Sequence, residues 1–126
     1  TLEANLRQIE QSIQDVREDA KRFGQPIRME LGYQLNQYAW LVSNTQGNKA
    51  RALKYSLESL NISNDSAKMD TCARCYFALG DFENAMRMQK LALKKSPYSP
   101  PLLRQLKQIE DALEQSEAEA SNPSAS

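Results

Sequence analysis

Histidine is absent from the 126 residues of this chain. It is the commonest general base and metal ligand, and Ser-His or Cys-His nucleophile pairs cannot form without it. The chain also has only four glycines, which are too scattered to build a phosphate-binding loop. These absences argue against a catalytic domain, so we expect no enzymatic activity, no metal and no other cofactor.

An excess of charge of one sign is also missing, because 16 Lys and Arg balance 16 Asp and Glu. A neutral chain lacks the long-range attraction that draws basic proteins to nucleic acids. No apolar run reaches the roughly 18 residues of a membrane-spanning helix. We therefore expect no nucleic-acid partner and no membrane insertion in this segment. The first residue is Thr rather than Met, so we expect a processed chain or a segment of a larger protein, with its compartment open.

A local basic stretch does not change this expectation. The segment from Arg87 to Lys107 holds six basic residues and no acidic one, but five acidic residues follow between 110 and 119. Opposite charges on adjacent helices usually make a solvated, self-compensating surface. Only Tyr98 is interleaved as a stacking aromatic.

The two cysteines, Cys72 and Cys75, have the Cys-x-x-Cys spacing within a predicted helix. A structural zinc site takes about four ligands, and a thioredoxin-like motif accompanies a βαβ pattern. Neither condition is met here. We interpret both residues as structural thiols, with Cys72 buried as a small apolar side chain.

The first 23 residues carry one narrow apolar stripe with 4-3 spacing, formed by Leu2, Leu6, Ile9, Ile13, Val16, Ala20 and Phe23. This spacing predicts an amphipathic helix, and Gly24 and Pro26 end it, which defines an N-terminal unit at 1–25. Two interpretations remain open. The stripe can fold back onto the rest of the chain as a cap, or it can pair two chains as a coiled coil and give a homodimer.

The rest of the chain repeats itself after 33 to 34 residues. Hydrophobic periodicity and turn residues predict helices at about 27–44, 49–62, 66–79, 81–95 and 100–115. A Gly-Asn or Gly-Asp turn separates the helices of each pair. The matching positions are Ala39 and Ala73, Gly47 and Gly80, Asn48 and Asp81, Ala52 and Ala85, Leu53 and Met86, Leu60 and Leu93, and Ser63 and Ser96. A repeat of this length is typical of stacked helical hairpins.

One set of positions within 66–99 identifies a family pattern, namely Ala73, Tyr76, Gly80, Asp81, Phe82, Ala85, Ala92 and Pro97. This pattern resembles the tetratricopeptide repeat, which has small residues where its paired helices touch. Met69 and Cys72 depart from the family's usual large aromatic and Leu, but both fill apolar space. The preceding unit, 32–65, resembles the family less closely, because Ser56, Ser59 and Asn64 replace an aromatic residue, Ala and Pro.

The resemblance implies an all-α fold, a right-handed α-α superhelix of tetratricopeptide-like hairpins beside the N-terminal heptad-patterned helix. The tetratricopeptide-like domain would span 27–115, with repeats at about 32–65 and 66–99 and a capping helix at about 100–115. Ala39, Ala52, Ala73 and Ala85 are then expected where helix axes approach most closely. Residues 116–126 are small and polar, and we expect a disordered tail there.

Repeats of this family hold a peptide on the inner face of the first helix of each hairpin. Carried over position by position, the resemblance implies a groove formed by Tyr33, Asn36, Trp40, Ser43, Asn44, Asp70, Arg74, Phe77, Arg104 and Gln108. The amides suit an extended backbone and the aromatic rings suit anchoring side chains. The alternative is that Trp40 packs on the N-terminal helix and that the chain itself fills the groove.

The expected function is therefore a non-catalytic scaffold that holds a peptide or protein segment in a concave groove. A receptor for acidic C-terminal tails is not expected, since the family's basic clamp needs several Lys and Arg and only Arg74 and Arg104 are present. The alternative function is self-assembly, in which the stripe of residues 2–23 dimerises the chain.

Overall fold

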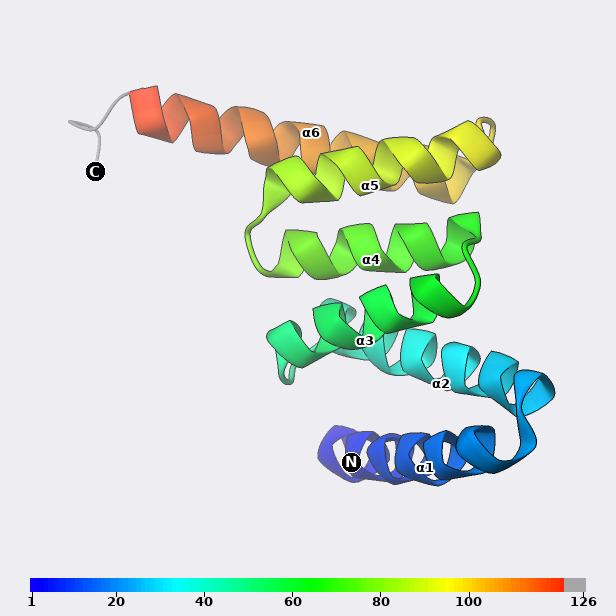
Figure 1. Ribbon diagram of the computed structural model, residues 1–126. Coiled ribbons are helices and arrows are strands. Elements are labelled where there is room, and N and C mark those ends of the chain that lie inside the picture. The colour runs from blue at the N-terminus through cyan, green and yellow to red at the C-terminus, as the bar shows by residue number, and fades with distance from the viewer. Residues whose placement is uncertain (122–126) are drawn as a thin grey trace.

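The computed structural model describes residues 1–121, and in this range the chain forms six helices and no strand. The all-α class predicted from the sequence is confirmed. Figure 1 shows the helices stacked from the N-terminal to the C-terminal end of the molecule. They are α1 (Leu2–Phe23), α2 (Gln25–Asn44), α3 (Lys49–Ile62), α4 (Ser66–Ala78), α5 (Phe82–Lys95) and α6 (Pro100–Ser121).

Short polar side chains fix where four of these helices begin. Thr1, Asn48, Asp65 and Asp81 each accept a hydrogen bond from the backbone N–H three residues further on. Such caps satisfy amide groups that the first helical turn leaves without partners.

The turn between α4 and α5 is built on Gly80, which has φ +79°. This left-handed conformation lets the Gly80 N–H donate to Phe77 O at 3.0 Å and the Asp81 N–H donate to Tyr76 O at 3.0 Å. The pair of bonds is the Schellman motif that ends many helices. The chain therefore reverses at the predicted turn, and α5 returns antiparallel to α4 (Figure 1).

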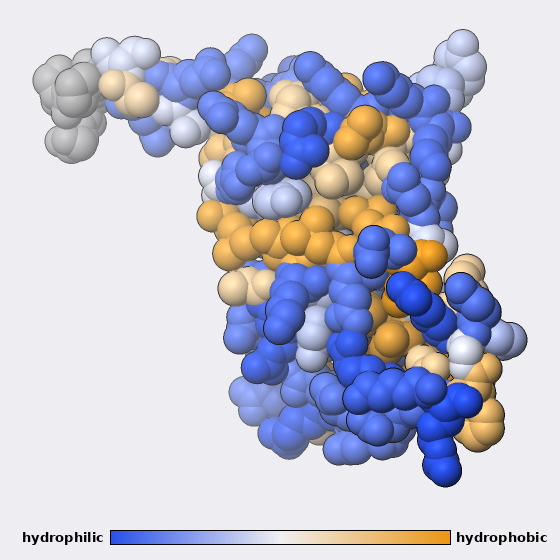
Figure 2. Space-filling model, viewed as in Figure 1, coloured by the Kyte–Doolittle hydropathy of each residue, from blue (hydrophilic) through white to orange (hydrophobic). Residues whose placement is uncertain are grey.

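Each helix packs against its neighbours in the stack, and the first helices of the hairpins also touch one another. Besides the sequential pairs, α2 packs on α4, and α4 packs on α6. The seams contain small residues, since Ala39, Ala52, Ala73 and Ala85 are all 0% exposed. Figure 2 shows the face that carries α3 and α5, where apolar residues gather over α4. Helices α2 and α6 lie behind this face (Figure 1).

The apolar stripe of α1 is covered within the chain. Ile13 is 0% exposed, and Leu6, Ile9, Val16 and Ala20 pack beside it against the core of α2. Leu2 and Phe23, at the two ends of the stripe, do not belong to this cluster, and Phe23 is 66% exposed. Within the single chain most of the stripe therefore lies against α2.

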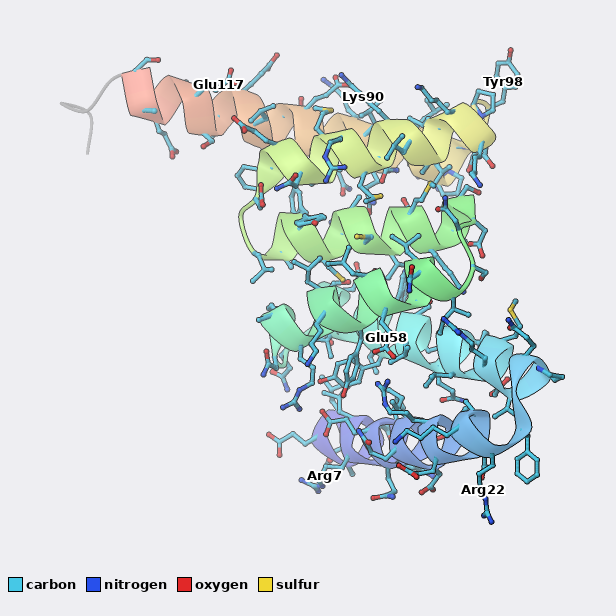
Figure 3. The ribbon with its side chains drawn as sticks, viewed as in Figure 1. Arg7, Arg22, Glu58, Lys90, Tyr98 and Glu117 are labelled. Carbon is cyan, nitrogen blue, oxygen red and sulfur yellow. The ribbon has the colours of Figure 1, made fainter. Side chains whose placement is uncertain are left out.

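Ion pairs add to this attachment by joining α1 to α3. The Arg17 guanidinium forms a double hydrogen bond with the Glu58 carboxylate, and Figure 3 shows Glu58 on the side of α3 that faces α1. Glu10 accepts hydrogen bonds from Arg51 Nη1 at 2.9 Å and from Tyr38 Oη at 2.9 Å.

Helix α6 is longer than the sequence indicated, because it continues to Ser121 rather than ending at about 115. Its last turns are supported by hydrogen bonds from Gln115 Nε2 to Glu119 Oε1 at 3.0 Å and from Ser121 Oγ to Glu117 O at 2.8 Å. Small size and polarity therefore do not prevent helix formation where alanines and i,i+4 pairs occur together. The expected tail from 122 to 126 lies outside the described residues. No helix within residues 1–121 is long and apolar enough to cross a membrane.

Enlarging an alanine in a seam should destabilise the fold. Ala73→Leu or Ala85→Leu forces extra volume between closely packed helices, and we expect each to lower the free energy of unfolding by about 1 to 3 kcal/mol. Urea denaturation followed by circular dichroism measures this loss. Ala118→Leu, on the exposed end of α6, is the matched control and should have no such effect. Unchanged stability of both buried variants would contradict the packing described here.

Candidate functional site

Two adjoining cavities lie on the side of the molecule formed by α2, α4 and the start of α6. The first cavity has a volume of about 520 Å³ and is lined by Asn36, Gln37, Trp40, Ser66, Ala67, Asp70, Thr71, Ser96, Ser99, Pro101 and Leu102. The second cavity has a volume of about 230 Å³ and is lined by Trp40, Asn44, Asp70, Arg74, Pro101, Arg104, Gln105 and Gln108. Trp40, Asp70 and Pro101 belong to both, so the cavities form one continuous groove.

Seven of the ten groove residues expected from the sequence line these cavities, namely Asn36, Trp40, Asn44, Asp70, Arg74, Arg104 and Gln108. They come from helices that are not neighbours in the sequence. The packing of α2 on α4 and of α4 on α6 brings them together. Trp40 is 51% exposed and is not enclosed by α1.

The other three expected residues line neither cavity. Tyr33 is exposed, and its hydroxyl accepts a hydrogen bond from Gln37 Nε2 at 2.6 Å. Ser43 is buried, and its hydroxyl donates to Trp40 O at 3.1 Å. Phe77 packs against Phe82, with ring centroids 5.4 Å apart.

Part of the first cavity comes from the connection between α5 and α6 and from the first turn of α6, which the sequence prediction did not assign to the groove. Ser96 and Ser99 lie in the connection, and Pro101 and Leu102 lie in α6. Ser96 Oγ lies 2.9 Å from Ser66 Oγ at the start of α4. The sequence repeat could have indicated this contribution. Ser96 matches Ser63 of the preceding repeat, and each follows the second helix of its hairpin.

A buried amide network forms the base of the groove. Gln89 Nε2, on a side chain that is 0% exposed, donates to Asp70 Oδ1 and to Leu102 O, each at 2.9 Å. Gln105 Nε2 donates to Asp70 Oδ1 at 2.9 Å and to Gln89 Oε1 at 2.7 Å. One carboxylate oxygen therefore joins α4, α5 and α6. Burial raises the pKa of Asp70, although the Gln89 hydrogen bond and the Arg74 charge act in the opposite direction.

Arg74 is held beside this network by neutral partners. Its Nε donates to Gln105 Oε1 at 2.8 Å, and its Nη2 donates to Gln108 Oε1 at 2.8 Å. Its guanidinium carbon also lies 5.1 Å from the centre of the Phe77 ring. Burial lowers the pKa of Arg74, and the charge of Asp70 partly offsets that effect.

The two cysteines are free thiols in the helix core. Cys72 and Cys75 are both 0% exposed, and the Cys75 thiol donates to Ala39 O at 3.8 Å. Burial raises the pKa of Cys72 to about 11 and that of Cys75 to about 12. Within residues 1–121 no group of three or more His, Cys, Asp and Glu side chains could hold a metal ion.

Comparison with known proteins assigns no family: no protein-family model matches the chain, and no curated protein matches it either. The interpretation of the groove therefore depends on its own geometry and chemistry.

Removing the charge of Asp70 should stabilise the fold at neutral pH. A carboxyl whose pKa is raised on folding is destabilising when ionised, and this effect is lost as the pH falls through the folded-state pKa. Asp70→Asn keeps an oxygen for Gln89 and Gln105, so we expect a higher melting temperature at neutral pH and a smaller advantage in acid.

Thermal melts across this pH range measure the difference between the variant and the original chain. Asp19→Asn, which removes an exposed carboxylate on α1, is the matched control and should not reproduce the pattern. A lower melting temperature of Asp70→Asn at neutral pH would contradict the unfavourable ionisation inferred for Asp70.

The buried thiols should resist labelling in the folded protein. Only thiolates react readily, and both the raised pKa values and the burial reduce reaction of Cys72 and Cys75. With a disulfide reagent at mildly alkaline pH, we expect labelling at least about 100-fold slower than for a free thiol of ordinary pKa. Both thiols should react at once in denaturant. Rapid labelling of the folded chain would show that α4 does not bury them.

Proposed function

We propose that this protein is a non-catalytic scaffold that binds a peptide or protein segment along the groove of α2, α4 and α6. In this proposal the hairpins α2–α3 and α4–α5, followed by α6, form a tetratricopeptide-like right-handed superhelix with α1 as its cap. The contacts of α2 with α4 and of α4 with α6 support that arrangement, because they align the first helix of each unit.

The observation that carries the proposal is the pair of adjoining cavities. They share a half-exposed tryptophan and are contributed by three helices, so they extend across the repeats rather than along one element. The volume of the first cavity, about 520 Å³, is within the range of about 300 to 1,000 Å³ that is usual for ligand sites. Exposed aromatic rings in hollows are frequent anchors at interfaces.

The polar lining suits an extended backbone. Asn36, Gln37 and Asn44 carry amides that both donate and accept hydrogen bonds, and they stand along one side of α2. Ser66 and Ser99 also line the first cavity and add hydroxyl groups to its polar lining. In this proposal a bound segment satisfies its backbone groups on this lining while one of its side chains contacts Trp40.

The self-assembly alternative has less support. A coiled coil between two chains needs a free apolar seam, but Ile13 is fully buried and its neighbours on the stripe pack against α2. Only Phe23, at the end of the stripe, is largely exposed.

Selection from a random displayed peptide library tests the scaffold proposal. Recovered peptides are synthesised and titrated against the whole chain, with the emission of Trp40 as the reporter, since it is the single tryptophan. We expect binding to change this emission. The double variant Asn36→Ala, Asn44→Ala should weaken binding by about tenfold or more, because two amide anchors are lost.

Gln8→Ala, Gln14→Ala removes two exposed amides from α1 and is the matched control, which should leave the affinity unchanged. The proposal fails if no peptide is recovered, or if the recovered peptides neither alter Trp40 emission nor respond to the groove variant.

A further inference from the structure

The residues that line the first cavity indicate the charge of the ligand group that it prefers. Asp70 is the only charged residue among those that line it, and the remaining polar groups are amides and hydroxyls. In its ionised form Asp70 gives the cavity one negative charge. A group of opposite charge is favoured in such a site over a neutral or acidic one.

Half of the Asp70 carboxylate is left without a partner. Oδ1 accepts both amide hydrogen bonds, from Gln89 and from Gln105. Oδ2 accepts none from residues 1–121, and Asp70 forms no ion pair with any Lys or Arg in that range. Asp70 lines both cavities, so it borders the groove. The two amide hydrogen bonds hold its Oδ1 in place.

The nearby cation does not neutralise this oxygen directly. Arg74 directs its guanidinium to Gln105 and Gln108, and it lies over the Phe77 ring. Arg74 and Arg104 both line the second cavity and neither lines the first. A positive ligand group is thus repelled from the second cavity and favoured in the first.

Two further groups of the first cavity suit a cation. Trp40 offers the face of an indole, which attracts ammonium and guanidinium groups within about 6 Å. Asn36 Oδ1 is buried and has no hydrogen-bond donor within the described residues. Rotation of the Asn36 amide toward the cavity would therefore break no hydrogen bond made by Oδ1. In that orientation Oδ1 would accept a hydrogen bond from an N–H group of the ligand.

We propose that the first cavity binds a lysine or arginine side chain of the partner segment, held by Asp70 Oδ2 and the indole of Trp40. The inference rests on the proposed scaffold function and specifies the chemistry that the groove recognises at one position. Asn36 supplies an additional acceptor, since a lysine ammonium has three donors and an arginine guanidinium five.

Asp70 also has a structural role, so the test must separate the two. Asp70→Asn retains an oxygen for Gln89 and Gln105, and it replaces the charged Oδ2 acceptor with an uncharged NH2 donor. It therefore preserves the amide network while it eliminates the proposed cation site. Asp19→Asn on α1 changes the net charge equally and leaves the groove intact.

The experiment titrates the whole chain with matched capped peptides of seven residues, made of alanine, glycine and serine around one central residue. That residue is lysine, acetyl-lysine, norleucine or glutamate. Nuclear magnetic resonance reports on the site directly, because Trp40 gives the single indole N–H signal. We expect the lysine peptide to shift this signal and to bind about tenfold more tightly than the norleucine and acetyl-lysine peptides, a difference of about 1.4 kcal/mol.

Asp70→Asn should abolish that preference, whereas Asp19→Asn should retain it. Equal binding of the lysine and norleucine peptides overturns the cation site and leaves the scaffold proposal standing. Absence of any shift with all four peptides also overturns the cation site, and the library selection then decides the scaffold proposal separately. Library peptides that bind the groove without a basic residue would count against this inference in the same way.

Discussion

A single carboxylate oxygen fixes the geometry of the groove. Oδ1 of Asp70, on α4, accepts amide hydrogens from Gln89 on α5 and Gln105 on α6. Buried amides are expensive to leave unpaired, so a closed network of this kind permits few relative positions of the helices that carry it. The wall of the first cavity that Pro101 and Leu102 form is positioned in this way. Asp70 therefore takes part both in the packing of the helices and in the proposed recognition of a ligand.

The two sides of the stack have different chemistry. Small residues in the seams allow the helices to approach closely, and the apolar side chains around them fill two connected cores. On the side of α2, α4 and α6 the surface is hollow and lined by amides, hydroxyls and a tryptophan. On the side of α3 and α5 it carries a band of apolar residues over α4 (Figure 2). The same stack of helices thus presents two distinct surfaces.

Local signals predicted the helices well. Asn48, Asp65 and Asp81 are strong caps, and Gly80 requires a conformation that other residues avoid, so the hairpin boundaries could be inferred from neighbouring residues alone. The end of α6 could not be inferred in this way. The prediction for residues 116–121 relied on their small, polar composition and did not include i,i+4 contacts such as that of Gln115 with Glu119.

The groove was only partly predictable for a related reason. The tetratricopeptide resemblance placed Asn36, Trp40 and Asp70 in the expected groove, and all three line a cavity. The resemblance did not reveal that Ser43 is covered or that Phe77 pairs with Phe82, since both outcomes depend on the angle between packed helices. The Gln89 and Gln105 amides were missed because a buried glutamine has no distinctive pattern in sequence. Its role becomes visible only once three helices are placed together.

The attachment of α1 has a consequence for how the molecule opens. In the described residues the helix packing of α1 is on α2, and its links to α3 are two partly exposed ion pairs. Partly exposed ion pairs contribute less stability than buried apolar contacts. In a linear array each unit is held mainly by its neighbours, so the terminal helix detaches at a lower free energy than the middle of the stack. Sub-global fraying from the N-terminal end would uncover Leu31 and Leu35 while leaving the carboxylate-amide floor of the groove assembled.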